Sequence, residues 1–246
     1  MNFPIYVVSV RSFTDRHRHM EQIARTTGLT FEYVWEYDAD QLDNLVDYKV
    51  DINLRPASIS NVLKHLEAQR KFLETESNVA LILEDDVILY EGFCDKLKEI
   101  VKQSNLLESG WLIFLGGADN KVDSRFLEAA ELGLVESPIT TAEAYLVDRR
   151  GCELRRDWLS KNTIDRQADH QLKVMDSTLL INHYCVTHPM ATQGSLTGLF
   201  QTALDSSRAK RSPRFLRLRF EYNKFRRQTM RRFLASCRNF LRKGRG

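Results

Sequence analysis

Apolar residues near the start of the chain occur first as a continuous run, then at helical spacing, and then in alternation with polar residues. The run Phe3–Val10 is rich in β-branched and aromatic residues and predicts a strand. Residues 14–27 predict a helix that ends at Gly28. Phe31–Tyr37 alternates apolar and polar side chains and predicts a second strand. Strand, helix and strand in this order favour an α/β fold with a right-handed crossover.

The rest of the chain continues this alternation of strands and helices. Residues 58–74 carry apolar side chains at helical spacing, among them Ile59, Val62 and Leu66, and predict a long helix. The later apolar runs are short and unbroken, as in strands buried on both faces of a parallel sheet. We therefore expect one domain with a mainly parallel, Rossmann-like sheet covered by helices. The further predicted elements are strands at 79–83 and 111–115, a strand within 138–148 and one at 179–186, and helices at 91–105, 149–160 and 168–175.

The composition is that of a globular protein. Of the 246 residues, 43% are hydrophobic, and only 11 are Gly and 5 are Pro. The four cysteines, Cys94, Cys152, Cys185 and Cys237, form no C-x-x-C pair, which favours reduced thiols over a zinc site or a disulfide framework. The N-terminus resembles no signal peptide, and no segment approaches the roughly 18 apolar residues of a membrane-spanning helix. We therefore expect a cytoplasmic protein.

The net charge of +3 conceals two segments of opposite charge. Residues 208–246 contain 15 Lys or Arg and one acid, Glu221, whereas residues 1–207 contain 21 bases and 32 acids. The polar stretch 205–213 separates the two segments. We therefore expect a catalytic domain over 1–207 and a physically different segment over 208–246.

The basic segment also carries an apolar stripe, which predicts a basic amphipathic helix that binds an anionic membrane surface. Two alternatives stay open. The helix packs on the domain, or it binds nucleic acid, because aromatic residues interleave with arginines between Phe215 and Arg227. An acidic domain without a basic groove makes nucleic acid the less favoured partner. The stripe consists of Met230, Phe233, Leu234, Cys237, Phe240 and Leu241.

Three consecutive acids follow a run of five apolar residues. Glu84, Asp85 and Asp86 follow the apolar residues 79–83, and apolar residues resume behind them. Like charges at the end of a buried strand are costly, because they repel and because burial disfavours the charged form. A hard cation such as Mn²⁺ or Mg²⁺ would remove that repulsion. The alternative is a solvated turn that caps the next helix.

The first predicted strand ends in residues suited to an anion. Ser9 to Arg16 lies at its carboxyl end, where sheets of this class bind ligands, and a basic cluster there suits a pyrophosphate. Solvated surface arginines are the alternative. The sequence contains no P-loop, G-x-G-x-x-G, G-x-S-x-G or H-E-x-x-H motif and no internal repeat. Walker-type hydrolysis, Rossmann redox chemistry and serine hydrolysis are therefore unsupported.

Four segments, in this order, resemble glycosyltransferase family 25, the lipooligosaccharide galactosyl- and glucosyltransferases of bacterial cell envelopes. Ser9 stands where the family usually has Asn, and Lys64 stands where a Ser is usual. The segments are Ile5–Val10 followed by Thr14-Asp-Arg16, Leu54–Ile59 with His65-Leu66, Ala80–Val87, and Thr140–Val147 with Gly151 and Ala168–Leu172.

The resemblance implies a GT-A fold, a UDP-sugar donor and inversion at the anomeric carbon. A metal held by Asp86, with Glu84 or Asp85 assisting, would stabilise the charge that develops on the leaving nucleotide. Inversion also needs a base for the acceptor hydroxyl, for which Asp169 is the first candidate and Asp165 the second. The alternative for Asp169 is an acid that interacts with a helix dipole.

The remaining candidates surround this proposed centre. The expected nucleotide-sugar contacts are Ser9, Arg16, His65, Glu84, Asp85 and Gln193, and His188 is a further candidate metal ligand. His65 lies beside an apolar stripe, which by itself is typical of a structural histidine. We expect a metal-dependent, inverting transferase that moves a hexose, with galactose favoured, to a lipid-anchored lipooligosaccharide at the inner face of the membrane. The alternative is a degenerate transferase domain whose basic tail binds nucleic acid or membrane.

Overall fold

The computed structural model describes residues 1–42, 45, 48–51, 53–116, 133–136, 141–202, 210–230, 233 and 237. Within these residues, a seven-stranded sheet has the order β2-β1-β3-β7-β5-β8-β6, and β4 and β9 form a second, two-stranded sheet. The strands are β1 (Ile5–Val8), β2 (Glu32–Val34), β3 (Val79–Glu84), β4 (Val87–Leu89), β5 (Trp111–Phe114), β6 (Leu134–Glu136), β7 (Ala144–Asp148), β8 (Asn182–Val186) and β9 (Ala191–Gln193). The helices are α1 (Thr14–Thr27), α2 (Pro56–Leu73), α3 (Phe93–Ser104), α5 (Arg149–Leu159), α6 (Ala168–Leu179), α7 (Gly194–Thr197) and α9 (Pro213–Lys224), followed by the π-helix η1 (Phe225–Met230).

The main sheet is largely parallel, as predicted. β1 pairs in parallel with both β2 and β3, and β5 pairs in parallel with β8. β7 runs antiparallel between β3 and β5, and β6 runs antiparallel along β8. The sequence did not predict these two reversals. Since β1 and β3 are parallel neighbours, their carboxyl ends meet at the same edge of the sheet.

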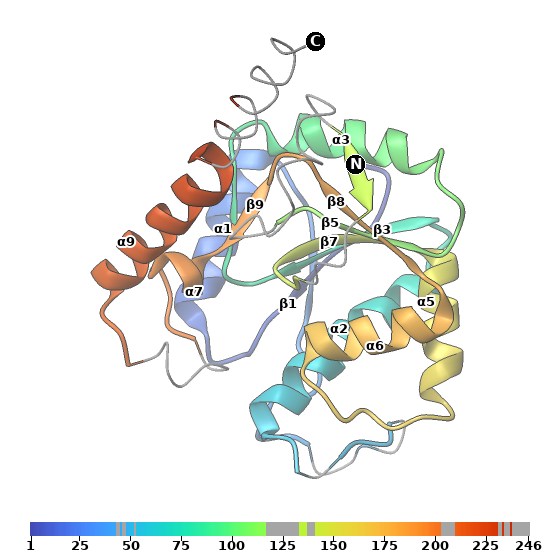
Figure 1. Cartoon of the computed structure of the whole chain (residues 1–246). Helices are drawn as coiled ribbons and strands as arrows, with labels where there is room; N and C mark the ends of the chain where they lie inside the picture. Colours follow the sequence, from blue (N-terminus) through green and yellow to red (C-terminus); the bar gives the residue numbers. More distant parts are fainter. Residues whose placement is uncertain are drawn as a thin grey trace.

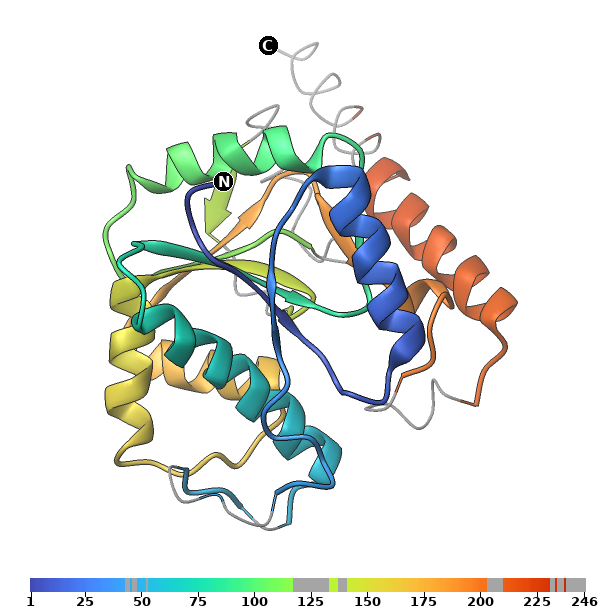
Figure 2. The same ribbon diagram turned by 180° about the vertical axis from the view of Figure 1, so that it is seen from behind.

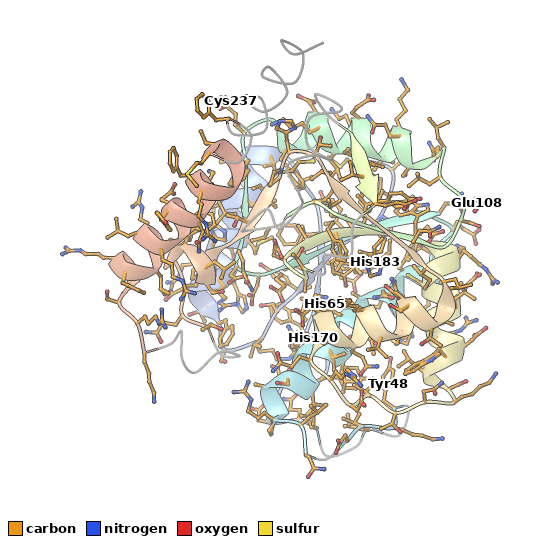
Figure 3. The ribbon with its side chains drawn as sticks, in the orientation of Figure 1. Tyr48, His65, Glu108, His170, His183 and Cys237 are labelled. Carbon is orange, nitrogen blue, oxygen red and sulfur yellow. The ribbon has the colours of Figure 1, made fainter. Side chains whose placement is uncertain are left out.

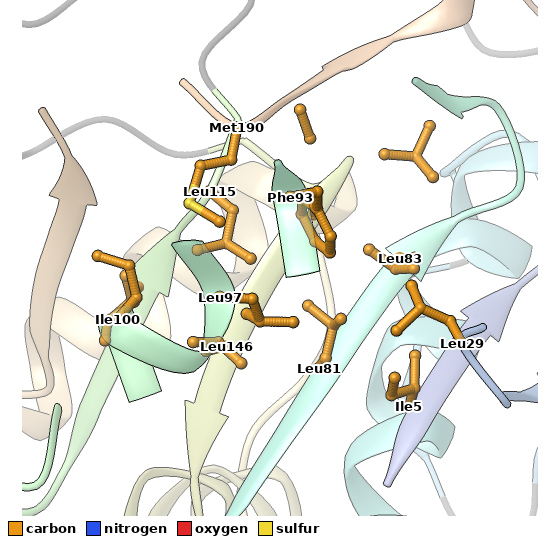
Figure 4. Close-up of a cluster of buried hydrophobic side chains, with 14 of the residues drawn as sticks. Ile5, Leu29, Leu81, Leu83, Phe93, Leu97, Ile100, Leu115, Leu146 and Met190 are labelled. Atoms are coloured by element: carbon orange, nitrogen blue, oxygen red, sulfur yellow. The ribbon is translucent and has the colours of Figure 1, made fainter. Parts of the chain in front are cut away.

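Helices cover both faces of the sheet in a three-layer arrangement (Figure 1). Alternate residues of β3 point to opposite faces, as the strand period of two requires. Leu81 and Leu83 pack toward α1 and α3, whereas Ala80 and Ile82 pack toward α2 and α5. Figure 4 shows the first of these clusters, where Phe93 and Leu97 from α3 lie against the sheet. Both faces are therefore buried, which explains the unbroken apolar run of β3.

The helix boundaries follow local signals in the sequence. α1 ends at Gly28, whose φ of +70° is the left-handed conformation that favours glycine. α2 begins with Pro56 in its first turn, and a third apolar cluster fills the space between α2 and α6. Seen from behind in Figure 2, α2, α5 and α6 form the layer on the opposite side of the sheet from α1 and α3.

The end of β3 agrees with the prediction, whereas the end of α6 and the start of β8 differ from it. β3 ends at Glu84, so the acids stand at the end of the buried strand as predicted, and Val87–Leu89 form the separate strand β4. α6 continues to Leu179, so the predicted strand 179–186 begins only at Asn182. The reason is that a short apolar run does not distinguish the last turn of a helix from the start of a strand. β4 pairs with β9 rather than with the main sheet.

The basic segment begins as part of the folded body. α9 packs along α7 and buries Leu216 and Phe220. Three of the six residues of the predicted apolar stripe, Leu234, Phe240 and Leu241, lie outside the described residues, and so does the predicted domain boundary at 207. No helix in the described ranges has the length and apolar character to span a bilayer.

Candidate active site

A cavity of about 410 Å³ lies at the carboxyl ends of β1 and β3. The strand ends contribute Ser9 and the three acids, and the β2–α2 connection contributes Asp38 and Asp40. One face of α2 lines the cavity with small and polar side chains, and the segment after β9 supplies the remaining wall. Sheets of this class bind ligands outside the carboxyl ends of their strands, so the position fits a substrate cavity.

Glu84 is held at the cavity by side chains from two elements. Its Oε1 accepts a hydrogen bond from Asn61 Nδ2 of α2 at 3.3 Å, and its Oε2 accepts one from Gln193 Nε2 at 2.8 Å. His65 Nε2 lies 3.5 Å from Oε1. Burial alone would raise the pKa of Glu84, but His65 and Asn61 outweigh it and hold the pKa below its usual value. Glu84 is therefore an ionised, fixed carboxylate.

Both carboxylate oxygens of Asp85 are engaged. Oδ1 accepts a hydrogen bond from Arg16 at 2.6 Å, and Oδ2 accepts one from the Ser9 hydroxyl at 2.7 Å. Arg16 also donates to the carbonyl of Gln201 at 2.6 Å. The ion pair thus joins the end of β3 to α1 and to the segment after α7. Because both of its carboxylate oxygens accept hydrogen bonds from the protein, Asp85 holds the segments of the cavity wall together.

Asp86 differs from its neighbours. Its Oδ2 accepts a hydrogen bond from the Ser195 N–H at 3.0 Å, whereas its buried Oδ1 has no hydrogen-bond partner in the described residues. Burial and the adjacent charge of Glu84 raise the pKa of Asp86 to about 7. An unpartnered carboxylate oxygen in a buried site is costly, and a cation would relieve that cost.

The oxygen atoms at the acidic turn fit a cation that the protein holds through few ligands. Among the residues described, no group of three or more His, Cys, Asp or Glu side chains is arranged to hold a metal. Asp86 Oδ1 is the one available oxygen of the acidic turn, since Glu84 and Asp85 are bonded as described above. Mg²⁺ in phosphate sites is commonly bound by one or two carboxylates plus substrate phosphates. The residues therefore fit a cation shared with a diphosphate rather than an all-protein cage.

A buried ion pair forms another part of the cavity wall. Lys64, 1% exposed, places its ammonium 2.7 Å from Asp38 Oδ1 and donates a hydrogen bond to the carbonyl of Glu36 at 2.8 Å. Asp38 also accepts the backbone N–H of Arg11 at 3.2 Å. Lys64 thereby ties the β2–α2 connection to α2. The pair accounts physically for a lysine at a position where a Ser is usual in the family that the sequence resembles.

His65 lies behind the cavity rather than in it. It is fully buried, and its Nδ1 is 2.9 Å from the hydroxyl of Tyr145 on β7. The structure therefore does not support His65 as a direct nucleotide contact, because Glu84 separates it from the cavity. Its position suits the structural alternative, in which it supports Glu84.

Further polar side chains are buried close to His65. Arg155 donates two hydrogen bonds to Asp176, at 2.7 and 2.8 Å, and a third to Gln69 at 3.1 Å. His183 Nε2 lies 2.5 Å from Asp176. His65 and His183 both lie between the sheet and the layer of α2 and α6 (Figure 3). This network fixes α5 and α6 against the sheet behind the acidic turn.

Three predicted site residues do not line the cavity. Asp165 is exposed and pairs with Arg166 at 3.2 Å. Asp169 occupies the first turn of α6, where its carboxylate accepts the backbone N–H of His170 at 2.9 Å. His188 follows β8 and lies 3.3 Å from the Thr187 hydroxyl. The structure thus gathers Ser9, Arg16, Gln193 and the three acids, but not these three residues or His65.

Sequence reasoning missed several cavity residues. Among them is Asn61, which shares the face of α2 that lines the cavity with Ala57, Ser60 and Lys64. Their spacing of three, four and seven residues was a signal that a polar helix face points at a site. Asp40 and Ser195 carried no comparable signal, because their positions depend on how distant segments pack.

Comparison with known proteins agrees with the resemblance. A model of glycosyltransferase family 25, described as LPS biosynthesis protein, matches residues 2–132, just over half of the chain. No curated protein matches. Among solved structures, the galactosyltransferase LgtC, in complex with donor and acceptor sugar analogs, is 11% identical with a TM-score of 0.41, over 73% of this chain and 71% of that chain.

Two further solved structures are similar at comparable levels. A glycosyltransferase involved in the glycosylation of the major capsid of PBCV-1 is 13% identical with a TM-score of 0.35, over 89% of this chain and 99% of that chain. A nucleoside-diphosphate-sugar pyrophosphorylase from Vibrio cholerae RC9 is 14% identical with a TM-score of 0.30, over 75% and 72% of the two chains. The family model therefore carries the assignment.

Proposed function

The chain belongs to glycosyltransferase family 25, and from this premise we propose that it transfers a hexose from a UDP-sugar to a lipooligosaccharide or lipopolysaccharide acceptor. Galactose is the proposed hexose. The observation that carries the proposal is the acidic turn Glu84-Asp85-Asp86 at the floor of a cavity at the strand ends. Three carboxylates there, each held differently, suit a ligand that brings both hydroxyl groups and a charged diphosphate.

The cavity residues divide between fixing the donor and handling its charge. Glu84, an ionised acceptor, suits the hydroxyl groups of a ribose or a hexose, which donate hydrogen bonds. Arg11 lines the cavity, and Arg16 holds a cationic guanidinium at the same wall. Cations placed there attract a diphosphate and stabilise the negative charge that grows on it as the glycosidic bond breaks. Arg16 is pre-positioned by Asp85, so little reorganisation is needed.

A divalent cation, Mn²⁺ or Mg²⁺, is the proposed cofactor. Asp86 would hold it through Oδ1, with the diphosphate supplying further oxygens. When bound, the cation supplies Lewis-acid stabilisation of the leaving diphosphate. Ser195 keeps the Asp86 carboxylate oriented by binding its other oxygen. The proposed ligand set does not include His188, which lies outside the cavity lining.

Inversion at the anomeric carbon requires a base that takes the proton of the acceptor hydroxyl. Asp169 and Asp165 were expected to serve, but neither lines the cavity. Asp40 does line it, and its side chain is exposed at the outer part of the β2–α2 connection. We therefore propose Asp40 as the first candidate for the base and keep Asp169 as the second. An exposed carboxylate there can meet an acceptor that enters from solvent.

The proposed acceptor is a lipid-anchored oligosaccharide, which places the enzyme at the cytoplasmic face of the inner membrane. The basic segment 208–246 supports this, because an anionic membrane surface attracts clustered Lys and Arg residues. Nucleic acid is the less favoured partner, since residues 1–207 carry 32 acids against 21 bases.

Transfer of labelled hexose tests the proposal. Purified protein is incubated with UDP-galactose or UDP-glucose, Mn²⁺ and a truncated lipooligosaccharide, and the product is analysed by mass spectrometry and NMR. We expect a mass gain of one hexose and an anomeric configuration opposite to that of the donor. Retained configuration would refute the inverting mechanism. No transfer from any sugar nucleotide by the folded protein would favour a degenerate domain.

A further inference from the structure

Helix α9 has two apolar faces, and only one of them is used by the fold. Leu216 and Phe220 point toward the domain and are 8% and 6% exposed. On the opposite face, an outer strip of apolar side chains recurs at intervals of three, four and three residues. In the described part of the chain, these side chains are exposed to solvent. The outer strip consists of Phe215, Leu218 and Tyr222 of α9 and Phe225, the first residue of η1, which are 48, 72, 63 and 58% exposed.

Contacts at both ends fix α9 on the domain. The Ser212 hydroxyl caps the helix by accepting the Phe215 N–H at 3.3 Å. Pro213 packs so closely on Gly198 that a Cβ there would lie 2.5 Å from the Pro213 carbonyl oxygen. At the other end, the Lys224 ammonium lies 5.1 Å from the centre of the Tyr90 ring. The outer strip is therefore held in one orientation, facing away from the body.

Basic side chains flank the outer strip on both sides. At 100° per residue, Arg214 and Arg217 fall on one side of it and Arg219 on the other. All three are exposed. Residues 210–227 contain eight Lys or Arg and one acid, whereas residues 1–207 are net acidic. Only this side of the described molecule thus combines an apolar strip with dense positive charge. Figure 1 shows α9 at the outer edge of the molecule, next to α7.

We propose that the outer strip of α9 is the membrane-docking surface of this protein, lying in the interface of an anionic lipid bilayer with its flanking arginines at the phosphate level. An apolar stripe bordered by basic residues is the pattern of helices that lie in the plane of a membrane. The inference deepens the proposed function and rests on it for the lipid-anchored acceptor. It moves the docking surface from the stripe at 230–241 to the folded helix before it.

Lipid explains the outer strip better than nucleic acid does. A phosphate polymer would satisfy the arginines, but it would leave Leu218 in water, because an aliphatic side chain gains nothing from a phosphate backbone. A lipid interface accommodates both kinds of group at once. Tyrosine is also typical of the level of lipid headgroups, which suits Tyr222.

The docking surface is connected to the cavity through one short segment. α9 packs on α7, and α7 begins directly after Gln193, which holds Glu84. The Ser195 N–H of α7 binds Asp86, and the Gln201 carbonyl accepts from Arg16. Docking through α9 would therefore place the cavity wall near the bilayer surface, where a lipid-anchored acceptor is presented.

Vesicle sedimentation of the full-length protein tests the docking surface. The vesicles contain phosphatidylcholine alone or with phosphatidylglycerol. We expect wild type to bind only the anionic vesicles, less strongly at high salt. Leu218→Ser should weaken partitioning about fivefold, and the triple variant with Tyr222→Ser and Phe225→Ser should weaken it on the order of a hundredfold. The matched control is Leu106→Ser in the loop after α3, at a side chain that is 87% exposed, and it should bind as wild type does.

Charge is tested separately from apolar contact. Arg217→Gln with Arg219→Gln should weaken partitioning about 25-fold, at about fivefold for each charge. The control, Lys96→Gln with Lys98→Gln, removes the same charge from α3 and should have no effect. Anionic-vesicle binding of the Leu218 triple variant within twofold of wild type would overturn the proposal. The proposal would also be overturned if duplex DNA displaced wild type from the vesicles and bound wild type and the triple variant equally well.

Sugar-nucleotide binding by the same proteins separates this inference from the proposed function. None of the substituted residues lines the cavity, so every variant should bind UDP-galactose as wild type does. A protein that binds anionic vesicles through the outer strip but binds no sugar nucleotide would refute the transferase and leave the docking surface standing. The reverse result would refute only the docking surface.

Discussion

The buried pair of Lys64 and Asp38 offers the sharpest test of how the cavity wall is held. Lys64→Met removes the ammonium and keeps a side chain of similar length. Asp38 then keeps the N–H of Arg11 but loses its cationic partner. Because both side chains are almost inaccessible, at 2 and 5% exposure, solvent cannot take the place of the lost charge.

The expected cost follows from the burial of the carboxylate. Breaking a buried pair by removing one partner typically costs about 3–5 kcal/mol. We expect about 3 kcal/mol for Lys64→Met, since Asp38 keeps one hydrogen bond and borders the cavity. In a chain of this size that lowers the melting temperature by about 6–12 °C. The β2–α2 connection should also loosen, so that donor affinity falls.

Removing both charges should recover most of the loss. Burial lowers the pKa of Lys64 even though Asp38 raises it, which means that the pair does not fully offset the desolvation of the lysine. The free energy of unfolding of the double variant, Lys64→Met with Asp38→Asn, should therefore lie within about 1 kcal/mol of the wild-type value. The assay is urea unfolding of wild type, both single variants and the double variant. A coupling energy below about 1 kcal/mol would refute the reasoning.

Two further predictions concern buried and cavity carboxylates. Burial alone would raise the pKa of Asp176, but Arg155 holds it below its usual value. As pH falls, the Asp176 carboxylate is therefore protonated in the unfolded chain before it is protonated in the folded chain. The stabilisation that this carboxylate contributes is complete above about pH 5 and is lost progressively below about pH 4. Urea unfolding across this range should show the fall in the free energy of unfolding, and Arg155→Met should make that fall smaller. An unchanged fall in the free energy of unfolding at acidic pH in Arg155→Met would contradict this. If Asp40 is the base, Asp40→Asn should lower kcat at least about a hundredfold with little change in donor affinity. Asp169→Asn should retain most activity. A large loss of kcat in Asp169→Asn with little loss in Asp40→Asn would return the role of base to Asp169.

The sequence predicted those parts of the fold that depend on local signals. β1, α1 and its end at Gly28 followed from an apolar run, a helical period and a glycine with positive φ. The reversal of β7 carried no such signal, because strand direction is decided by partners far away in the chain. The pairing of β4 with β9 was missed for the same reason, since three residues are too few to show a period.

The candidate site was predictable where its residues adjoin a strand end. The acidic turn follows β3 directly, and Ser9 follows β1, so strand order alone brings them together. His65 was assigned to the nucleotide by its position in a motif, whereas its place beside the apolar stripe of α2 is typical of the buried histidine that the structure shows. Asp169 was placed by its position in a motif, whereas its actual location depends on the direction in which α6 crosses α2.

Calorimetric binding of UDP-galactose and UDP-glucose tests the central claim most directly. Wild type and Asp86→Asn are titrated with each nucleotide, in Mn²⁺ and in chelator. We predict binding to wild type in Mn²⁺ that is lost with chelator and in the variant, because Asp86 supplies the free carboxylate oxygen at the floor of the cavity. Asp169→Asn, outside the cavity, is the matched control and should bind normally. Absence of binding by folded wild type, or equal binding by Asp86→Asn, would contradict the account.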